Sequence, residues 1–122
     1  MDSFKKGDWE MRVIFCNAFS INMLEKDCRV KFAQVPKETA QFFIEKCLVK
    51  KEYELVWAIG HPDTSRVVAR LLGIEDPGAN RVNVKLNYRD IMVVAQYSGP
   101  RLPEGATSLP EGAEIQFWLV DI

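Results

Sequence analysis

Hydrophobic residues recur with two different periods along the first part of the chain. Short apolar runs rich in β-branched and aromatic residues predict strands over 11–17, 29–35 and 53–59. Between the second and third runs, apolar residues recur every three or four positions, which predicts an amphipathic helix over 36–51. A second pattern of this kind follows the third run and ends at Gly73. Strands and helices are therefore expected to alternate in this part of the chain.

The last third of the chain predicts antiparallel strands. Val82, Val84 and Leu86 alternate with polar residues, "NYRD" supplies turn residues, and "IMVVAQY" follows, so we expect a hairpin over 81–97. A loop then leads to a final strand, "AEIQFWLV". Alternating strands and helices followed by antiparallel strands predict an α/β fold, a single domain whose mixed sheet of about five strands is flanked by helices.

Length and composition bound the class of protein. The 122 residues allow one domain with a core, and 48% hydrophobic with 27% charged residues is the profile of an ordinary globular protein. The net charge of −1 lacks the basic excess of proteins that bind long nucleic acids non-specifically. No apolar run approaches the ~18 residues of a membrane span and no signal-peptide pattern opens the chain, so we expect an intracellular protein without a membrane partner. The polar residues 1–10 predict an N-terminal extension, in part flexible, ahead of the domain at 11–122.

The residues that commonly bind metals are scarce. Cys16, Cys28 and Cys47 are widely spaced and form no Cys-x-x-Cys pair, so buried free thiols are expected rather than a zinc site. The chain has one histidine and neither a phosphate-binding loop nor a dinucleotide-binding motif. We expect no metal and no cofactor.

The single histidine, His61, lies between an apolar strand and the start of a helix. In α/β sheets ligands bind at such junctions, and a helix N-terminus offers free N–H groups to an anion. The alternative, which is the more common use, is that His61 is a turn residue that caps the helix.

Other polar residues have the same two interpretations. Asn17, Ser20 and Asn22 follow the first strand, where they either contact a ligand near His61 or satisfy the backbone of a turn. Arg81 and Arg101 are either solvated surface charges or a clamp for a phosphodiester.

The pentapeptide Leu-Pro-Glu-Gly-Ala occurs twice, at 102–106 and at 109–113. Proline and glycine make both copies turn sequences. Only the first copy has an arginine, Arg101, directly in front of it. Glu104 of the first copy is therefore the candidate for a working carboxylate, and Glu111 of the second is expected to be a solvent-facing turn residue.

One histidine with an arginine and a carboxylate is sufficient for one kind of chemistry. RNA carries its own nucleophile, the 2′-hydroxyl beside each phosphate. An enzyme that uses it aligns the 2′-oxygen, stabilises charge on the phosphate and protonates the leaving 5′-oxygen. The products are 2′,3′-cyclic phosphates, and neither a metal nor a protein nucleophile is required.

Four sequence blocks occur in the same order in a group of small viral proteins: "NAFSINML" at 17–24, "AIGHPDTS" at 58–65, "NRVNVKL" at 80–86 and "RLPEG" at 101–105. On these blocks the chain resembles the viral anti-CRISPR ring nucleases of type III systems, first catalogued as a domain of unknown function in archaeal viruses. The resemblance spans 11–122, and four blocks in register make it far more specific than any one of them.

The resemblance implies a homodimer that binds cyclic tetra-adenylate across its subunit interface, in the cytoplasm of the host cell. It implies metal-independent cleavage of this ring into di-adenylates with 2′,3′-cyclic phosphates, which suppresses antiviral immunity. The family's catalytic histidine matches His61, the general acid. The family's Arg-x-x-Glu pair matches Arg101, for the phosphate, and Glu104, which orients the histidine of the same or the partner subunit.

Other positions match ligand-binding residues of the family: Asn17, Ser20, Asn22, Arg81, Gln96 and Gly105. Two departures accompany the resemblance. Residues 1–10 have no counterpart in the shortest members, and the spacing from Gln96 to Arg101 is one residue longer than in some archaeal viral members.

Two hypotheses from other classes remain beside the ring nuclease. One is a protein that sequesters a cyclic oligonucleotide without cutting it. The other is a viral interaction protein in which His61 has no chemical role.

Overall fold

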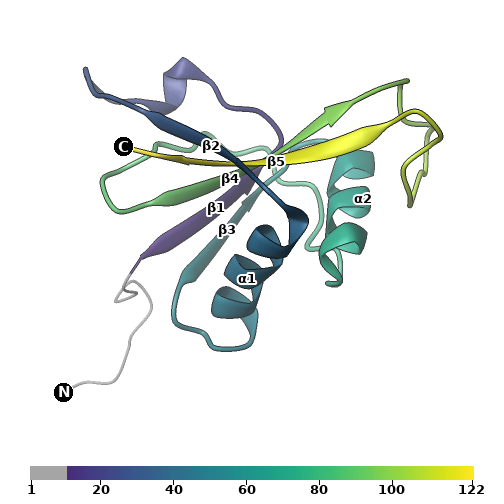
Figure 1. Cartoon of the computed structure of the whole chain (residues 1–122), viewed down its shortest axis with the longest axis horizontal. Helices are drawn as coiled ribbons and strands as arrows, with labels where there is room; N and C mark the ends of the chain where they lie inside the picture. The colour runs from purple at the N-terminus through teal and green to yellow at the C-terminus, as the bar shows by residue number, and fades with distance from the viewer. Residues whose placement is uncertain (1–10) are drawn as a thin grey trace.

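A computed structural model describes residues 11–122, and the extension predicted over 1–10 lies outside the described residues. One mixed sheet has the strand order β2-β5-β4-β1-β3 (Figure 1). Its strands are β1 (Arg12–Cys16), β2 (Lys31–Val35), β3 (Glu54–Ala58), β4 (Ile91–Ser98) and β5 (Glu114–Asp121). The helices are α1 (Lys37–Leu48), α2 (Pro62–Leu72) and the short 3-10 helix η1 (Ile21–Met23). The predicted α/β domain with a five-stranded mixed sheet is confirmed.

The central strand β1 pairs in parallel with both of its neighbours, β3 and β4. The last residue of β1, Cys16, lies opposite Ala58 of β3 and Val94 of β4. Strand β4 continues to Ser98, paired there with β5 alone. Because parallel strands end at the same edge of a sheet, the segments that follow β1, β3 and β4 all start from one side of the molecule.

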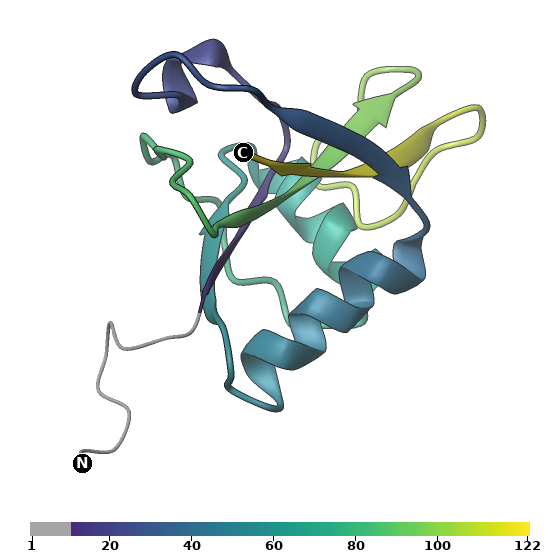
Figure 2. The same ribbon diagram turned by 60° about the vertical axis from the view of Figure 1, so that its left-hand side comes forward.

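The two faces of the sheet are covered differently. Along β1, Val13 and Phe15 belong to a core beneath α1 and α2, whereas Ile14 and Cys16 belong to a second core on the opposite face. Figure 2 shows both helices on one side of the sheet and the η1 segment on the other. Because β1 is buried on both faces, its sequence is apolar at successive positions instead of alternating.

The helical stripes predicted from the sequence face the sheet, with two differences at the margins. Ala40, Ile44 and Cys47 of α1 are buried, but Leu48 at its end is exposed. Pro36, predicted to lie in the first turn of the helix, is the N-cap of α1, so the helix begins one residue later than predicted. In α2, Gly73 ends the helix with φ 75°, the left-handed conformation that glycine adopts without strain.

The hairpin predicted over 81–97 is wrong in its first half. Residues 81–87 form no strand, although Val84 and Leu86 are buried as their alternation predicted. Both edges of β4 are already occupied, by β1 and by β5, so no edge is free to pair with this segment. It crosses the face opposite the helices instead, and the Leu86 N–H donates to the Met23 carbonyl at 2.8 Å.

A buried carboxylate anchors the turn that leads into β4. Asp90 is 6% exposed and accepts from the Nε and Nη2 of Arg12 at 3.3 and 2.6 Å, and from the Asn87 N–H at 2.8 Å. Arg12 also donates to the Lys85 carbonyl at 2.7 Å. The ion pair raises the pKa of Arg12, mainly through the hydrogen bond to Asp90. The start of β1 thereby holds the 85–90 segment in place.

The cysteines agree with the prediction at two of three positions. Cys16 and Cys47 are buried free thiols, and burial raises their pKa to about 11 and about 12. Cys28 is a free thiol but is exposed, because it lies in the loop before the edge strand β2.

Within 11–122, no helix has the length and apolar character needed to cross a membrane.

Replacing the anchoring carboxylate tests this account of the turn. We expect Asp90→Ala to lower the free energy of unfolding by about 2 kcal/mol, because three donors lose their acceptor while the half-exposed Arg12 recovers some hydration. Urea unfolding would measure the loss. Glu75→Ala, which removes an exposed carboxylate, is the control, and equal values for the two variants would contradict the anchoring role.

Candidate functional site

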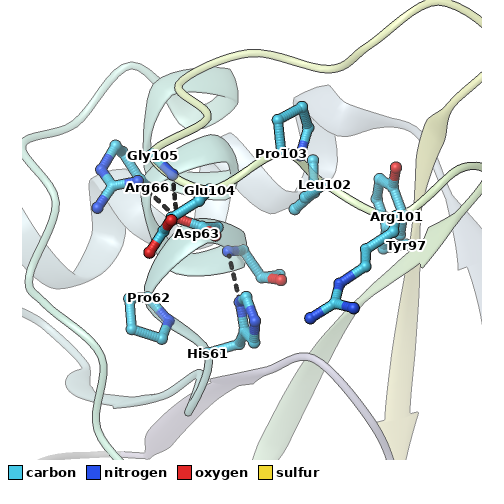
Figure 3. Close-up of a pocket in the computed structure, with 11 residues that line it drawn as sticks. His61, Pro62, Asp63, Arg66, Tyr97, Arg101, Leu102, Pro103, Glu104 and Gly105 are labelled. Atoms are coloured by element: carbon cyan, nitrogen blue, oxygen red, sulfur yellow. Dashed lines mark hydrogen bonds and ion pairs between the residues drawn. The ribbon is translucent and has the colours of Figure 1, made fainter.

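An open pocket of about 1030 Å³ lies between the N-terminus of α2 and the loop that follows β4 (Figure 3). It is lined by residues 61–64, Arg66, Tyr97 and 101–105. Parts of two of the sequence blocks, "AIGHPDTS" and "RLPEG", therefore form one site. They meet because β3 and β4 both point their carboxyl ends at this edge of the sheet.

His61 both caps a helix and lines the pocket. It is the N-cap of α2, with φ −100° and ψ 124°, and its Nδ1 accepts the Thr64 N–H at 3.4 Å. The interpretation of His61 as a helix cap is therefore confirmed. A nitrogen that accepts this hydrogen bond carries no proton, which leaves Nε2 as the ring nitrogen that can donate to a ligand.

Arg101 and Glu104 come from the loop on the other side of the pocket. Both are exposed, and the guanidinium of Arg101 points into the space between the loop and His61 (Figure 3). Within residues 11–122, no hydrogen bond or ion pair joins the three side chains to one another. The fold brings the predicted catalytic residues to one pocket, and of their side-chain polar atoms only Nδ1 of His61 is engaged by a neighbouring backbone group in the described chain.

The two copies of Leu-Pro-Glu-Gly-Ala fold into the same turn, as predicted. In each copy the alanine N–H donates to the proline carbonyl, at 3.0 Å in the first and 3.1 Å in the second. The glycine takes a left-handed φ of 79° in the first copy and 83° in the second, the conformation required at the third position of a type II turn. Their sequence identity thus extends to their backbone.

The copies differ in what holds them. The first is attached to α2: the Gly105 N–H donates to Asp63 Oδ1 at 3.1 Å, and Arg66 Nη1 donates to the Ala106 carbonyl at 3.0 Å. The same Arg66 nitrogen lies 2.9 Å from Asp63 Oδ1. The hydrogen bond from Arg66 is the main cause that lowers the pKa of Asp63, and the Gly105 amide adds to it.

The second copy closes the base of the loop instead. It leads directly into β5, and its Ala113 packs against Gly99, the first residue after β4. A Cβ on Gly99 would lie 2.6 Å from Ala113 Cα, so only glycine fits there. Glu111 is exposed and does not line the pocket that contains His61.

Arg81 lies beside His61 without lining the pocket. Its Nε donates to the Gly60 carbonyl at 3.1 Å. The neighbouring Asn80 is fixed to the end of β3, because its N–H donates to the Ile59 carbonyl and its side chain to the Trp57 carbonyl, both at 2.9 Å. The "NRVNVKL" block thus starts at the rim of the site.

The other predicted binding residues lie away from the pocket. Ser20 caps η1 and accepts the Asn22 N–H at 3.2 Å, which confirms the local turn interpretation for Ser20. Asn22 accepts from Lys85 through its carbonyl at 2.6 Å, and Asn17 follows β1. Gln96 faces the side of the sheet opposite the helices and lines a separate apolar groove there. The other residues of this groove are Phe19, Phe32, Val94, Trp118 and Val120.

Sequence reasoning gave no role to three pocket residues whose side chains bond the loop after β4. Asp63 and Arg66 have the spacing of an ordinary ion pair on a helix surface, and nothing in that pattern indicates that both also contact a distant loop. Tyr97 has the pattern of one more apolar residue of a strand, although its hydroxyl donates a hydrogen bond to the Pro100 carbonyl at the start of the loop.

Within 11–122, no group of three or more His, Cys, Asp or Glu side chains is arranged to hold a metal ion.

Comparisons with known proteins agree on one relationship. The family model described as STIV B116-like matches residues 13–119. Among solved structures, the chain is similar to B116 of Sulfolobus turreted icosahedral virus, with 30% sequence identity and a TM-score of 0.75. That match covers 91% of this chain and 99% of the viral one. No curated protein matches the sequence.

The close approach of Arg81 to Gly60 generates a prediction. A Cβ at residue 60 would lie 2.8 Å from Arg81 Cγ, so we expect Gly60→Ala to displace the Arg81 side chain and break its bond to the Gly60 carbonyl. The NMR signal of the Arg81 Nε–H would report the change. We also expect Gly60→Ala to lower the melting temperature of the wild-type protein but not that of an Arg81→Ala variant, in which the crowding is absent. An equal loss of melting temperature in both backgrounds would contradict the steric explanation.

Proposed function

Because the chain belongs to the STIV B116-like family, whose model matches 13–119, and because its pocket unites His61, Arg101 and Glu104, we propose that it is a metal-independent ring nuclease. The proposed substrate is cyclic tetra-adenylate, the second messenger of type III CRISPR defence. The products are di-adenylates ending in 2′,3′-cyclic phosphates, and the effect is to suppress antiviral immunity in the host cytoplasm. The observation that supports this most is that an acid, a cation and a carboxylate from two distant blocks line one open pocket.

The chemistry proposed for the site needs only the ring and these side chains. The 2′-oxygen of one adenosine attacks the adjacent phosphorus, and its proton leaves to solvent or to a neighbouring base. The bond from phosphorus to the 5′-oxygen breaks, and the protonated imidazole of His61 donates a proton to that oxygen. Arg101 stabilises the charge that develops on the phosphate. Two such cleavages turn one cyclic tetra-adenylate into two di-adenylates.

The cap contact of His61 bears on this mechanism. An imidazolium carries protons on both nitrogens, so the acid form of His61 cannot accept the Thr64 N–H. At 3.4 Å this contact is long for a hydrogen bond, and its loss on protonation costs little. In the proposal Glu104 then accepts from the released ring and orients it, within one subunit or across a dimer.

A homodimer is part of the proposal. In a single chain the pocket is open to solvent, and Ser20, Asn22 and Gln96 lie outside it. A cyclic tetranucleotide has four phosphates, more than one set of His61 and Arg101 can contact. In the proposal, two copies of the chain supply two such sets and enclose the ring, and the partner brings the predicted binding residues that lie outside the pocket of one chain to the ring.

A second candidate is a protein that binds the ring without cutting it. The observation in its favour is that His61 already has a structural use as the cap of α2. In that case His61 contributes stability, and the pocket serves only for binding.

Cleavage in the presence of excess EDTA separates the two functions. We expect turnover of cyclic tetra-adenylate to persist in EDTA and to yield 2′,3′-cyclic phosphates, and we expect His61→Asn to lower it by at least about 100-fold, because the acid is lost. Asparagine is a good N-cap, so this variant keeps the helix start while removing the chemistry. Binding of the ring without turnover by the wild-type protein would favour the sequestering protein, and absence of binding would refute both.

The two turns provide an internal control for Glu104. Each glutamate sits at the second position of the same turn, so Glu104→Ala and Glu111→Ala make the same local change. We expect Glu104→Ala to lower the cleavage rate by about 100-fold and Glu111→Ala by less than about twofold. Equal effects in a single-turnover assay would contradict the role assigned to the first turn.

A further inference from the structure

Two side chains of α2 form a clasp on the first Leu-Pro-Glu-Gly-Ala turn. Asp63 Oδ1 accepts the Gly105 N–H at 3.1 Å and Arg66 Nη1 at 2.9 Å. The same arginine nitrogen reaches the Ala106 carbonyl at 3.0 Å. Two of these contacts connect one helical turn to the backbone of two successive residues in a loop far away in the sequence. Figure 3 shows the contacts of Asp63 with Gly105 and Arg66.

The clasp holds the peptide groups that directly follow Glu104, and Asp63 stands two residues after His61. The second copy of the turn has no side-chain hydrogen bond of this kind in the described chain, so the turn sequence alone does not attach Glu104 to α2. The Asp63 side chain is 15% exposed and that of Arg66 36% exposed, so water competes with these bonds less than at an open surface. The position of Glu104 relative to His61 is therefore set through Asp63 and Arg66.

We propose that Asp63 and Arg66 are positioning residues of the reaction, which act by fixing the turn that carries Glu104 against the helix that carries His61. This inference rests on the proposed function. The role does not require either residue to touch the substrate, because Asp63 Oδ1 and Arg66 Nη1 act through their bonds to each other and to the backbone of the loop. The pairing also neutralises the Asp63 carboxylate, which would otherwise repel a phosphate in the same pocket.

The charge of Asp63 makes the clasp persist into acid. Hydrogen bonds from Arg66 and from the Gly105 amide lower the pKa of Asp63 below its ordinary value. A carboxylate with a lowered pKa in the folded state stabilises the contact above its unfolded pKa, and the contact weakens as pH falls through the folded one. Near neutral pH the clasp is therefore closed, and the substitutions below are compared there.

Amide exchange tests the clasp without reference to catalysis. Gly105 and Gly112 have the same neighbours, Glu before and Ala after, so their intrinsic exchange rates are equal. Since only Gly105 donates to Asp63, we expect its amide to exchange more slowly than that of Gly112 by about tenfold, and we expect Asp63→Ala to abolish the difference. Equal exchange in the wild-type protein would refute the clasp.

Kinetics test the positioning role. We expect Asp63→Ala to lower the single-turnover cleavage rate of cyclic tetra-adenylate by about 10- to 100-fold, with the dissociation constant changed by less than about threefold. Asp63→Asn, which keeps an oxygen acceptor for Gly105, should lose less. In a Glu104→Ala background, Asp63→Ala should cost no more than about twofold, because the group it positions is gone.

Each result identifies which idea fails. If Glu104→Ala lowers cleavage as expected but the effects of Asp63→Ala and Glu104→Ala multiply in the double variant, Asp63 does not act through Glu104 and the inference is wrong. If Asp63→Ala weakens binding as much as cleavage, it contacts the ring or supports the fold, which also overturns the inference; thermal unfolding separates the latter. If the wild-type protein leaves the ring intact, the proposed function fails and the positioning role with it, while the exchange of Gly105 still reports on the clasp.

Discussion

The parallel pairing of β1 with both of its neighbours is the constraint on which the rest of the structure depends. It aligns the carboxyl ends of β1, β3 and β4 at one edge of the sheet. The segments after β3 and β4 leave from this edge, and they carry His61 on one side and Arg101 with Glu104 on the other. Reversing either pairing would send one of these segments to the opposite end of the molecule. The direction of the strands thus determines where the pocket forms, and the side chains determine only how it is lined.

The two copies of the duplicated pentapeptide make different long-range contacts in this fold. Both copies form the same turn, because proline and a left-handed glycine determine the backbone locally. The first is held by Asp63 and Arg66 and borders the pocket, whereas the second packs Ala113 on Gly99 and returns the chain to β5. Identical local sequences acquire different roles because long-range contacts, not turn chemistry, decide what each one faces. The bonds to Asp63 and Arg66 place the turn of Glu104 at the pocket, and no such bond does this for the turn of Glu111 in the described chain.

His61 illustrates how one residue can serve the fold and a ligand site. As the N-cap of α2, it satisfies a backbone N–H that would otherwise lack a partner. The same position places its ring at the mouth of the pocket, because a helix that follows a parallel strand begins at the ligand-binding edge. The structural and chemical interpretations of this histidine are therefore compatible. They differ only in the protonation state of the ring that each requires.

The sequence by itself determined the local structure: the strands, both helices, the helix cap at His61, the two turns, and the candidate set of His61, Arg101 and Glu104. These features follow from hydrophobic period and backbone preference, which act over a few residues. Tertiary structure decided the rest. Residues 81–87 alternate like a strand but pair with none, because both edges of β4 were already filled. Asp63 and Arg66 look like a surface ion pair, and only folding brings the peptide groups after Glu104 within their reach. Hydrophobic periodicity predicts which residues are buried. Which groups meet across the chain depends on the order and direction of the strands, and no local sequence pattern predicts that order or direction.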